Sequence, residues 1–246
     1  MITTSVVSLL IATSCSRDDN GSASNPTTNG MVPTKIVEKN ASGTVINTFT
    51  FTYSGNKMIE ASNTAKIDGV GTVKFTYTGD KITKYEYIRT GSSNDYVTID
   101  YNSSGKPSKV AGSGYTNVGH YFGDYTYNSD GTVSITRNGS SSVITYNGSN
   151  LAKVVTTTSS KTYTANYEYD TNNNNAFKNV TGMEYIRDFG YVSAFYQLPG
   201  SAFATKITGE VFGWGNTATT YTATFNSDKL PTKVTDGSGN TYEITY

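Results

Sequence analysis

The stretch that decides the fold runs from Tyr96 to Val110 and reads YVTIDYNSSGKPSKV. In its first half, apolar and aromatic residues alternate with polar ones, as Val97, Ile99 and Tyr101 show. A pleated strand sorts such side chains onto two faces. Residues 102–105 (NSSG) supply a turn, because Gly and Asn accept the positive φ of a tight hairpin. Residues 106–110 lead back, so the stretch predicts one β-hairpin.

The same pattern recurs along the chain, with an aromatic residue closing a strand and a turn rich in Gly, Asn and Ser following it. The aromatic residues that mark it are Tyr53, Tyr77, Tyr101, Tyr127, Tyr146, Tyr169, Phe225 and Tyr246. The first six lie 19 to 26 residues apart. At about 3.3 Å per residue, this spacing fits two strands of ~8 to 10 residues with their turns. Each repeat is therefore one hairpin, and successive hairpins form an antiparallel meander.

The two faces of these strands differ in polarity. Between Thr48 and Tyr53, Phe and Tyr occupy one face and Thr occupies the other. A transmembrane barrel needs an apolar band on its outer face, so this sheet is expected to stand in water. An open meander of this length would leave two edge strands, which favours closure. We predict an all-β fold, an antiparallel up-and-down meander of hairpin repeats that forms a closed or nearly closed soluble barrel over residues 34–246.

The composition excludes several classes of function. The chain contains 20 Tyr, 10 Phe and 24 Gly but only five Pro, which favours short strands and tight turns over helices. Its 19 basic and 19 acidic residues cancel, which argues against nucleic acid as a partner. The single Cys excludes an intrachain disulfide framework and a Cys-based metal site. We expect a monomer with no cofactor and no metal.

The first 33 residues differ from the rest of the chain. Residues 1–15 contain a short apolar run whose length suits the hydrophobic region of a secretory signal. The sequence from Ile11 to Cys15 (IATSC) resembles a bacterial lipobox. This resemblance implies lipidation of Cys15; the alternative is a free or buried thiol. The acidic pair Asp18 and Asp19 resembles the export signal of Bacteroidetes surface lipoproteins, which implies an outer membrane location facing the cell exterior. Residues 16–33 are too poor in hydrophobic residues to fold and are expected to form a disordered tether.

Longer pieces of the repeat also carry a resemblance. They are Tyr101–Val110, Phe225–Val234 and Tyr169–Lys178. These pieces resemble the repeats of Bacteroidetes lipoproteins that carry a domain of unknown function with a porin-like fold, and they share motifs with the hairpin repeats of YD and RHS proteins. The likeness covers residues 34–246. It implies a soluble barrel on a lipid anchor and transfers no catalytic residue.

One segment, residues 172–214, interrupts the repeats. It begins with four Asn residues and continues with bulky side chains such as Phe177, Met183 and Phe203. The segment is either a plug that packs against the sheet or a loop that presents a binding surface. Packing is favoured, because large apolar residues are most often buried.

The sequence offers little catalytic chemistry. His120 is the only His, and without a nucleophile motif beside it a packing or surface role is favoured. A carboxylate pair for glycoside hydrolysis stays open as an alternative. The acidic residues on or near predicted strands are Asp100, Asp124, Glu168, Glu184 and Asp188. Residues 170–174 have the opening spacing of a calcium loop but lack its later ligands, so asparagine turns explain them better.

Aromatic side chains offer more for binding, since flat rings stack on sugars. The candidates are Tyr85, Tyr87, Tyr115, Tyr121, Tyr163, Tyr185, Tyr191 and Trp214. The alternative is that these rings form cross-strand pairs that stabilise the sheet. We expect a lipid-anchored surface protein without enzymatic activity that binds a glycan, peptide or protein, or serves as a structural spacer. The rival hypothesis is an enzyme resembling a glycoside hydrolase, with its carboxylate pair in the barrel mouth.

Overall fold

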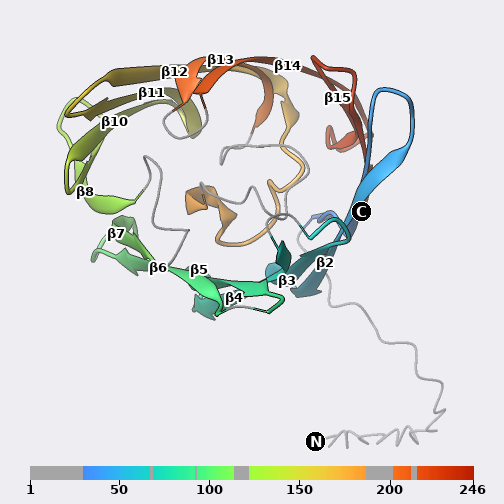
Figure 1. The fold of residues 1–246 in the computed structure, drawn as a ribbon, viewed down its shortest axis with the longest axis horizontal. Helices are drawn as coiled ribbons and strands as arrows, with labels where there is room; N and C mark the ends of the chain where they lie inside the picture. The colour runs from blue at the N-terminus through green and yellow to red at the C-terminus, as the bar shows by residue number, and fades with distance from the viewer. Residues whose placement is uncertain (1–29, 67–68, 92, 114–121, 187–201, 212–214) are drawn as a thin grey trace, which may run out of the picture.

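The computed structural model describes residues 30–66, 69–91, 93–113, 122–186, 202–211 and 215–246. Over these residues the chain forms one closed antiparallel β-barrel, whose strands form a ring in Figure 1. The strands are β1 (Lys35–Lys39), β2 (Val45–Ser54), β3 (Lys57–Asn63), β4 (Val70–Thr78), β5 (Lys81–Arg89), β6 (Asp95–Tyr101), β7 (Pro107–Gly112), β8 (Gly123–Tyr127), β9 (Val133–Arg137), β10 (Ser140–Asn147), β11 (Asn150–Thr158), β12 (Thr162–Asn174), β13 (Ala202–Val211), β14 (Gly215–Phe225), β15 (Pro231–Asp236) and β16 (Thr241–Thr245). The predicted all-β class and the predicted closure are both confirmed.

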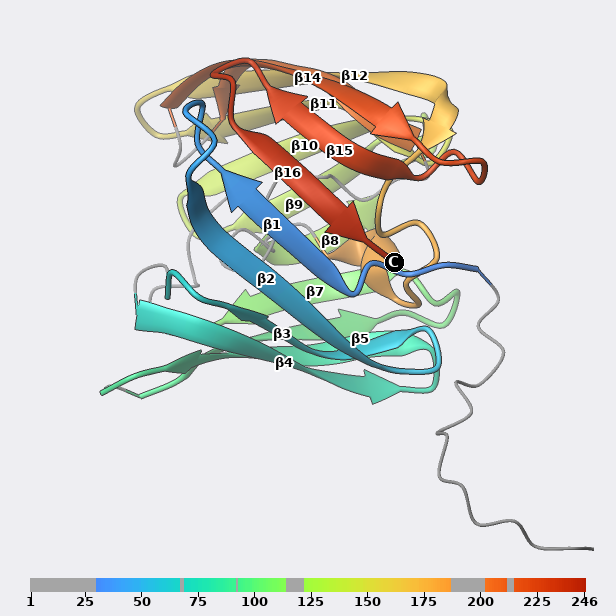
Figure 2. The same ribbon diagram turned by 90° about the vertical axis from the view of Figure 1, so that its right-hand side faces the viewer.

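Each strand pairs with its neighbours in sequence, and β1 closes the ring by pairing with β16. Figure 2 shows β1 lying between β2 and β16. Antiparallel neighbours need only short connections, which is why a chain of hairpin repeats can build the whole wall. The closed ring has no edge strand to protect.

The helical content of the described chain is small. The 3₁₀ helix η3 (Met183–Tyr185) lies between β12 and β13. In the part of the chain that the structure describes, no helix combines the length and the hydropathy of a membrane span.

Side chains sort between the two faces of the wall with the predicted period of two. In β2, Phe49 and Phe51 are buried, whereas Thr50 and Thr52 are exposed. The buried side chains of the wall join one hydrophobic core inside the barrel. They include Ile36, Val73, Ile99, Ile135, Ile144, Val154 and Val234. Because most inward positions are apolar and most outward ones polar, burial of the core stabilises the closed form.

A β-bulge accompanies the marker aromatic of many repeats. The strand register shifts next to Tyr53, Tyr77, Tyr101, Tyr146, Tyr169 and Phe225. A bulge bends the strand and increases its twist. Repeated at equivalent places around the ring, the bulges supply curvature that closure of the sheet needs.

The turns repeat as well. One five-residue loop, with the same two backbone hydrogen bonds, occurs at residues 40–44, 102–106, 128–132, 226–230 and 236–240. In the second of these, the Asn102 Oδ1 accepts the N–H groups of Ser104 at 3.1 Å and of Lys106 at 3.0 Å. Gly105 at its fourth position has φ of 79°, and Lys229 holds the equivalent position with φ of 61°. Only Gly adopts such a φ without steric cost.

The two ends of the barrel differ. Residue 30, where the described chain begins, and Tyr246 lie at one end, which we call the terminal end; it faces right in Figure 2. The turns that follow β2, β4, β6 and β10 lie at this end too, because these strands run parallel to β16. We call the opposite end, which carries the turns after β1, β3, β5 and β15, the far end.

The structure corrects the expected boundaries in two places. The wall strands β13 and β14 occupy most of residues 202–225, so the prediction of one irregular segment reaching residue 214 is wrong there. Within that segment, residues 175–186 leave the wall and pack inside the barrel, where Figure 1 shows them surrounded by strands. At the N-terminal side, Val32 and Pro33 are already buried, so the packed chain begins before residue 34.

Candidate functional site

The terminal end is filled by the segment from Asn175 to Ile186, which we call the plug. Its apolar side chains belong to the barrel core, and they are Ala176, Phe177, Val180, Met183 and Ile186. The Phe177 ring meets the Phe51 ring edge to face, with 5.5 Å between centroids. Of the two alternatives for residues 172–214, the plug therefore fits packing against the sheet and not a loop that presents a binding surface.

Polar contacts also fasten the plug to the wall. The Thr181 N–H donates to the carbonyl of Asn56 at 2.9 Å, and the Asn56 Nδ2 donates to the carbonyl of Asn179 at 2.9 Å. Gly182 has φ of 81°, and a Cβ there would meet the carbonyl oxygen of Asp80 at 2.9 Å. The plug thus needs Gly182 both for its turn and for its close approach to the wall.

The marker tyrosines serve the same end of the barrel. The hydroxyl of Tyr77 donates to the plug carbonyl of Thr181 at 3.1 Å, and that of Tyr53 donates to the carbonyl of Pro33 at 2.7 Å. Burial raises the pKa of Tyr53 and of Tyr77 above the ordinary value for tyrosine. These phenols stay neutral at physiological pH and act as structural donors.

Lysine side chains place their ammonium groups over several of these rings. Each of Lys57, Lys81 and Lys106 follows a turn and places its Nζ over the marker ring of the next hairpin, at 5.8, 5.2 and 5.0 Å from the centroids. The rings are those of Tyr77, Tyr101 and Tyr127. A cation over an aromatic face is attracted by the ring quadrupole, so the Lys of the repeat motif has a structural role.

The far end has a different interior. Buried polar residues of the barrel lie near the far ends of their strands: Asn47, Asn63, Asp95, Ser142 and Thr156. Several of them pair with one another or with a neighbouring residue. The Arg89 guanidinium holds the Asp95 carboxylate at 2.9 Å, and the hydroxyls of Ser142 and Thr156 are 2.9 Å apart.

One row of inward side chains at the far end crosses the closure of the ring. Glu38 lies opposite Asn47 of β2 on one side and opposite Tyr242 of β16 on the other. The Tyr242 hydroxyl donates to Asp236 Oδ2 at 3.2 Å. Burial raises the pKa of the Glu38 carboxyl above its ordinary value, and the negative charge of Asp236 adds to this effect. Glu38, Asn47 and Asp236 were not among the candidates, although Glu38 and Asn47 interrupt the apolar alternation at inward positions.

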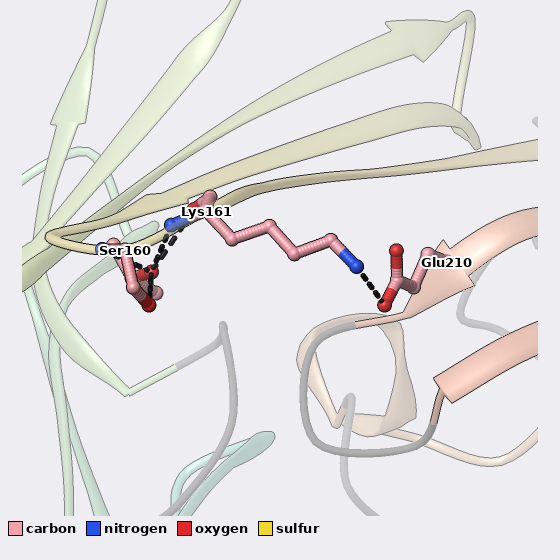
Figure 3. Close-up of polar contacts among 4 residues, drawn as sticks. Ser160, Lys161 and Glu210 are labelled. Carbon is pink, nitrogen blue, oxygen red and sulfur yellow. Dashed lines mark hydrogen bonds and ion pairs between the residues drawn. The ribbon is translucent and has the colours of Figure 1, made fainter.

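A further polar contact at the far end joins the turn after β11 to β13. The Lys161 Nζ lies 2.7 Å from the Glu210 carboxylate, as Figure 3 shows. The hydrogen bond to Glu210 raises the pKa of Lys161. The Lys161 Nζ also lies 5.2 Å from the centroid of Tyr163, so the ring of this candidate residue is already covered on one face.

The other aromatic candidates lie in three different places. Tyr85 and Tyr87 are 2% and 0% exposed, and their rings pack edge to face 5.6 Å apart. This burial corrects the prediction that they form an exposed sugar platform, because rings in the core cannot stack on a ligand. Tyr185 closes η3. The remaining predicted residues lie outside the described chain: Cys15, Tyr115, His120, Tyr121, Asp188, Tyr191 and Trp214.

The predicted carboxylates that the structure describes lie on four separate elements, β6, β8, β12 and η3. Asp100, Asp124, Glu168 and Glu184 are exposed. Glu168 pairs on the outer wall with Lys206 at 3.0 Å. In the part of the chain that the structure describes, no group of three or more His, Cys, Asp or Glu residues could hold a metal ion.

The stretch after Asp170 lies within β12, where the strand register shifts between Asp170 and Asn174, so it is an irregularity of a strand and not the expected turn. The Asp170 carboxylate accepts the N–H of Asn172 at 3.0 Å and the Nδ2 of Asn173 at 2.6 Å. These hydrogen bonds lower the pKa of Asp170. The carboxylate therefore stabilises the local backbone of this irregularity.

Comparisons with known proteins place the chain in a family. Among solved structures, it is similar to a porin-like protein from Bacteroides uniformis, with a TM-score of 0.41, 11% identity, and coverage of 87% of this chain and 97% of that one. No curated protein matches its sequence. The family model described as Teneurin YD-shell matches residues 10–185, more than half of the chain. The chain therefore belongs to the Teneurin YD-shell family.

Proposed function

We propose that this protein is a lipid-anchored cell-surface module without enzymatic activity, which binds its partner at the far end of the barrel. The anchor would be Cys15, and the surface would be the outer face of an outer membrane. The observation that carries this proposal is the asymmetry of the barrel, since its terminal end holds the plug and its far end contains several buried polar side chains.

The entry point of the chain supports this orientation. The Asn179 Nδ2 of the plug donates to the carbonyl of Met31 at 2.9 Å, so the chain reaches the barrel at the terminal end. A tether leading from Cys15 would hold this end toward the membrane. The far end would then face away from the membrane, where a partner can reach it.

The core and the outer wall support a binding role over transport. The plug and the inward side chains of the wall pack into one hydrophobic core, whereas a channel needs a polar, water-filled lumen. On the outer wall, residues such as Thr50, Thr76 and Glu168 are exposed. An outer face of this kind suits a barrel that stands in water on its tether.

The enzyme alternative has less support. Glu38 and Asp236 are two acidic residues that the fold brings to the far end. Asp236 Oδ1 accepts the N–H groups of Ser238 and Asn240, and its Oδ2 accepts the Asn240 Nδ2 and the Tyr242 hydroxyl. A glycosidase needs a second carboxylate that is free to attack the sugar or to activate water. Asp236 serves instead as a turn cap, which favours binding.

Replacement of the anchor residue tests the location. We expect Cys15→Ala to move the protein from the detergent phase to the aqueous phase on detergent partitioning, and to abolish its labelling by a membrane-impermeant reagent on whole cells. Ser22→Ala, in the same tether, is the matched control and should behave as the wild type. Membrane association that survives Cys15→Ala would refute the proposed anchor.

A further inference from the structure

The inward row at the closure of the ring contains a hydrogen-bond donor without a partner. Asn47 is 2% exposed, and its Nδ2 makes no hydrogen bond. Its Oδ1 is heavily used, because it accepts the N–H groups of Thr48, Thr64 and Ala65 at 2.9, 3.1 and 3.0 Å. These bonds fix the orientation of the amide, so Nδ2 cannot be exchanged with Oδ1. A buried donor left unpaired costs on the order of 1–3 kcal/mol, which a protein seldom tolerates without a use for it.

An acceptor lies beside this donor. Glu38 is the cross-strand neighbour of Asn47, and opposite residues on one face of a sheet have Cβ atoms about 4.5–5.5 Å apart. Glu38 is half-buried. The neighbouring Lys39 pairs with Glu243 at 2.6 Å, and the contacts of the described residues give Glu38 no ion pair of its own. A buried donor that makes no hydrogen bond therefore lies on the strand next to an acid that has no ion pair among the described residues.

The other residues around Glu38 and Asn47 limit the chemical class of the ligand. Tyr242, on the other side of Glu38, presents a ring and a hydroxyl that is held by Asp236. The Asn47 Nδ2 can only donate a hydrogen bond, and the Glu38 carboxylate can only accept one. A ligand hydroxyl satisfies both groups at once, because it can accept from Nδ2 and donate to the carboxylate. An anion would be repelled by Glu38 and Asp236. A cation would meet the N–H groups of Asn47, which can only donate.

We propose that Asn47, Glu38 and Tyr242 form a binding site for a neutral polyhydroxylated ligand, a sugar unit of a glycan, at the far end of the barrel. The inference rests on the proposed function, because it takes the far end as the end that faces the partner. Asn47 and Glu38 bind the ligand hydroxyls, and Asp236 positions the Tyr242 hydroxyl.

The test uses the full chain carrying Cys15→Ala, so that the result does not depend on membrane anchoring. The ¹⁵N-labelled protein is titrated with neutral hexasaccharides of glucose, mannose, galactose and N-acetylglucosamine, to several times a Kd of roughly 1 mM. We expect at least one of them to shift the side-chain NH₂ signals of Asn47. Loss of a hydrogen bond to a charged group corresponds to a roughly ten- to hundredfold weaker affinity, which we expect for Glu38→Gln.

Two further variants complete the experiment. Glu86→Gln makes the same chemical change on the outer wall, where Glu86 pairs with Lys84 at 3.1 Å, and should bind as the wild type does. Asn47→Asp keeps the oxygen that accepts the backbone N–H groups but removes the donor, so this variant should also bind the saccharide more weakly. It replaces Glu38→Gln as the test if that variant does not fold. The site is refuted if none of the saccharides shifts the Asn47 signals, if Glu38→Gln or Asn47→Asp binds with wild-type affinity, or if only a cationic probe such as spermidine binds.

These results separate the two proposals. If no saccharide shifts the Asn47 side-chain signals but the protein is anchored through Cys15, the sugar site is overturned and the proposed location of the module stands. Sugar binding by a protein that proves not to be anchored would do the reverse.

Discussion

Removal of the Phe177 ring tests whether the plug is part of the core or a separable lid. The ring is 7% exposed and packs edge to face against Phe51. Truncation of a buried Phe to Ala costs about 3–5 kcal/mol through lost transfer energy and the cavity left behind, and an aromatic pair contributes ~0.5–1.5 kcal/mol beyond its buried area. Because domains are commonly stable by only about 5–15 kcal/mol, we expect Phe177→Ala to remove a large share of the free energy of unfolding.

The assay compares Phe177→Ala with Phe49→Ala in urea, since Phe49 is a wall residue that is 1% exposed. If the plug folds with the wall, both variants should lose about 3–5 kcal/mol in one cooperative transition. Phe177→Leu, which keeps most of the volume, should lose less than about 1.5 kcal/mol. Wild-type global stability of Phe177→Ala, together with faster exchange of the Thr181 amide proton alone, would show that the plug opens independently and would refute the reasoning.

Two other substitutions give opposite signs of effect. Lys229→Gly should stabilise the protein by ~0.5–1 kcal/mol, because a non-Gly residue at φ of 61° is strained, and the melting temperature should rise by about 1–4 °C. Gly105→Ala at the equivalent turn should lower the melting temperature. Equal melting temperatures of the two variants would contradict this account of the loops. Glu38→Gln tests the raised pKa of Glu38. The protonated acid favours the folded state below the ordinary pKa of 4.5, and this contribution is lost as the pH rises through the raised folded value. Glu38→Gln should therefore gain more stability over the wild type at pH 7 than at pH 4 in thermal melts, whereas a constant difference would argue against the shift.

The sequence determined the local parts of this fold. The alternation in stretches such as residues 96–101 predicts strands, the NSSG figure predicts turns, and the marker aromatics give the repeat. These features depend on residues close together in the chain, so a pleat and a turn type are enough to specify them. The candidate binding aromatics Tyr85 and Tyr87 show the limit of such local prediction. A bulge after Ile82 shifts the alternation by one residue, and only with this bulge known do Tyr85 and Tyr87 fall on the buried face with Ile82.

Only the tertiary structure decided how the ring closes and what lies within it. Pairing of β1 with β16 brings Glu38 beside Tyr242 from opposite ends of the chain, and no local pattern encodes that contact. The plug likewise owes its place to the space that the closed wall encloses and to partners such as Asn56 and Phe51, far from it in sequence. Hydrophobic burial drives such packing without regard to direction. The sequence therefore specified that these residues would be buried, and the closed barrel determined which residues they pack against.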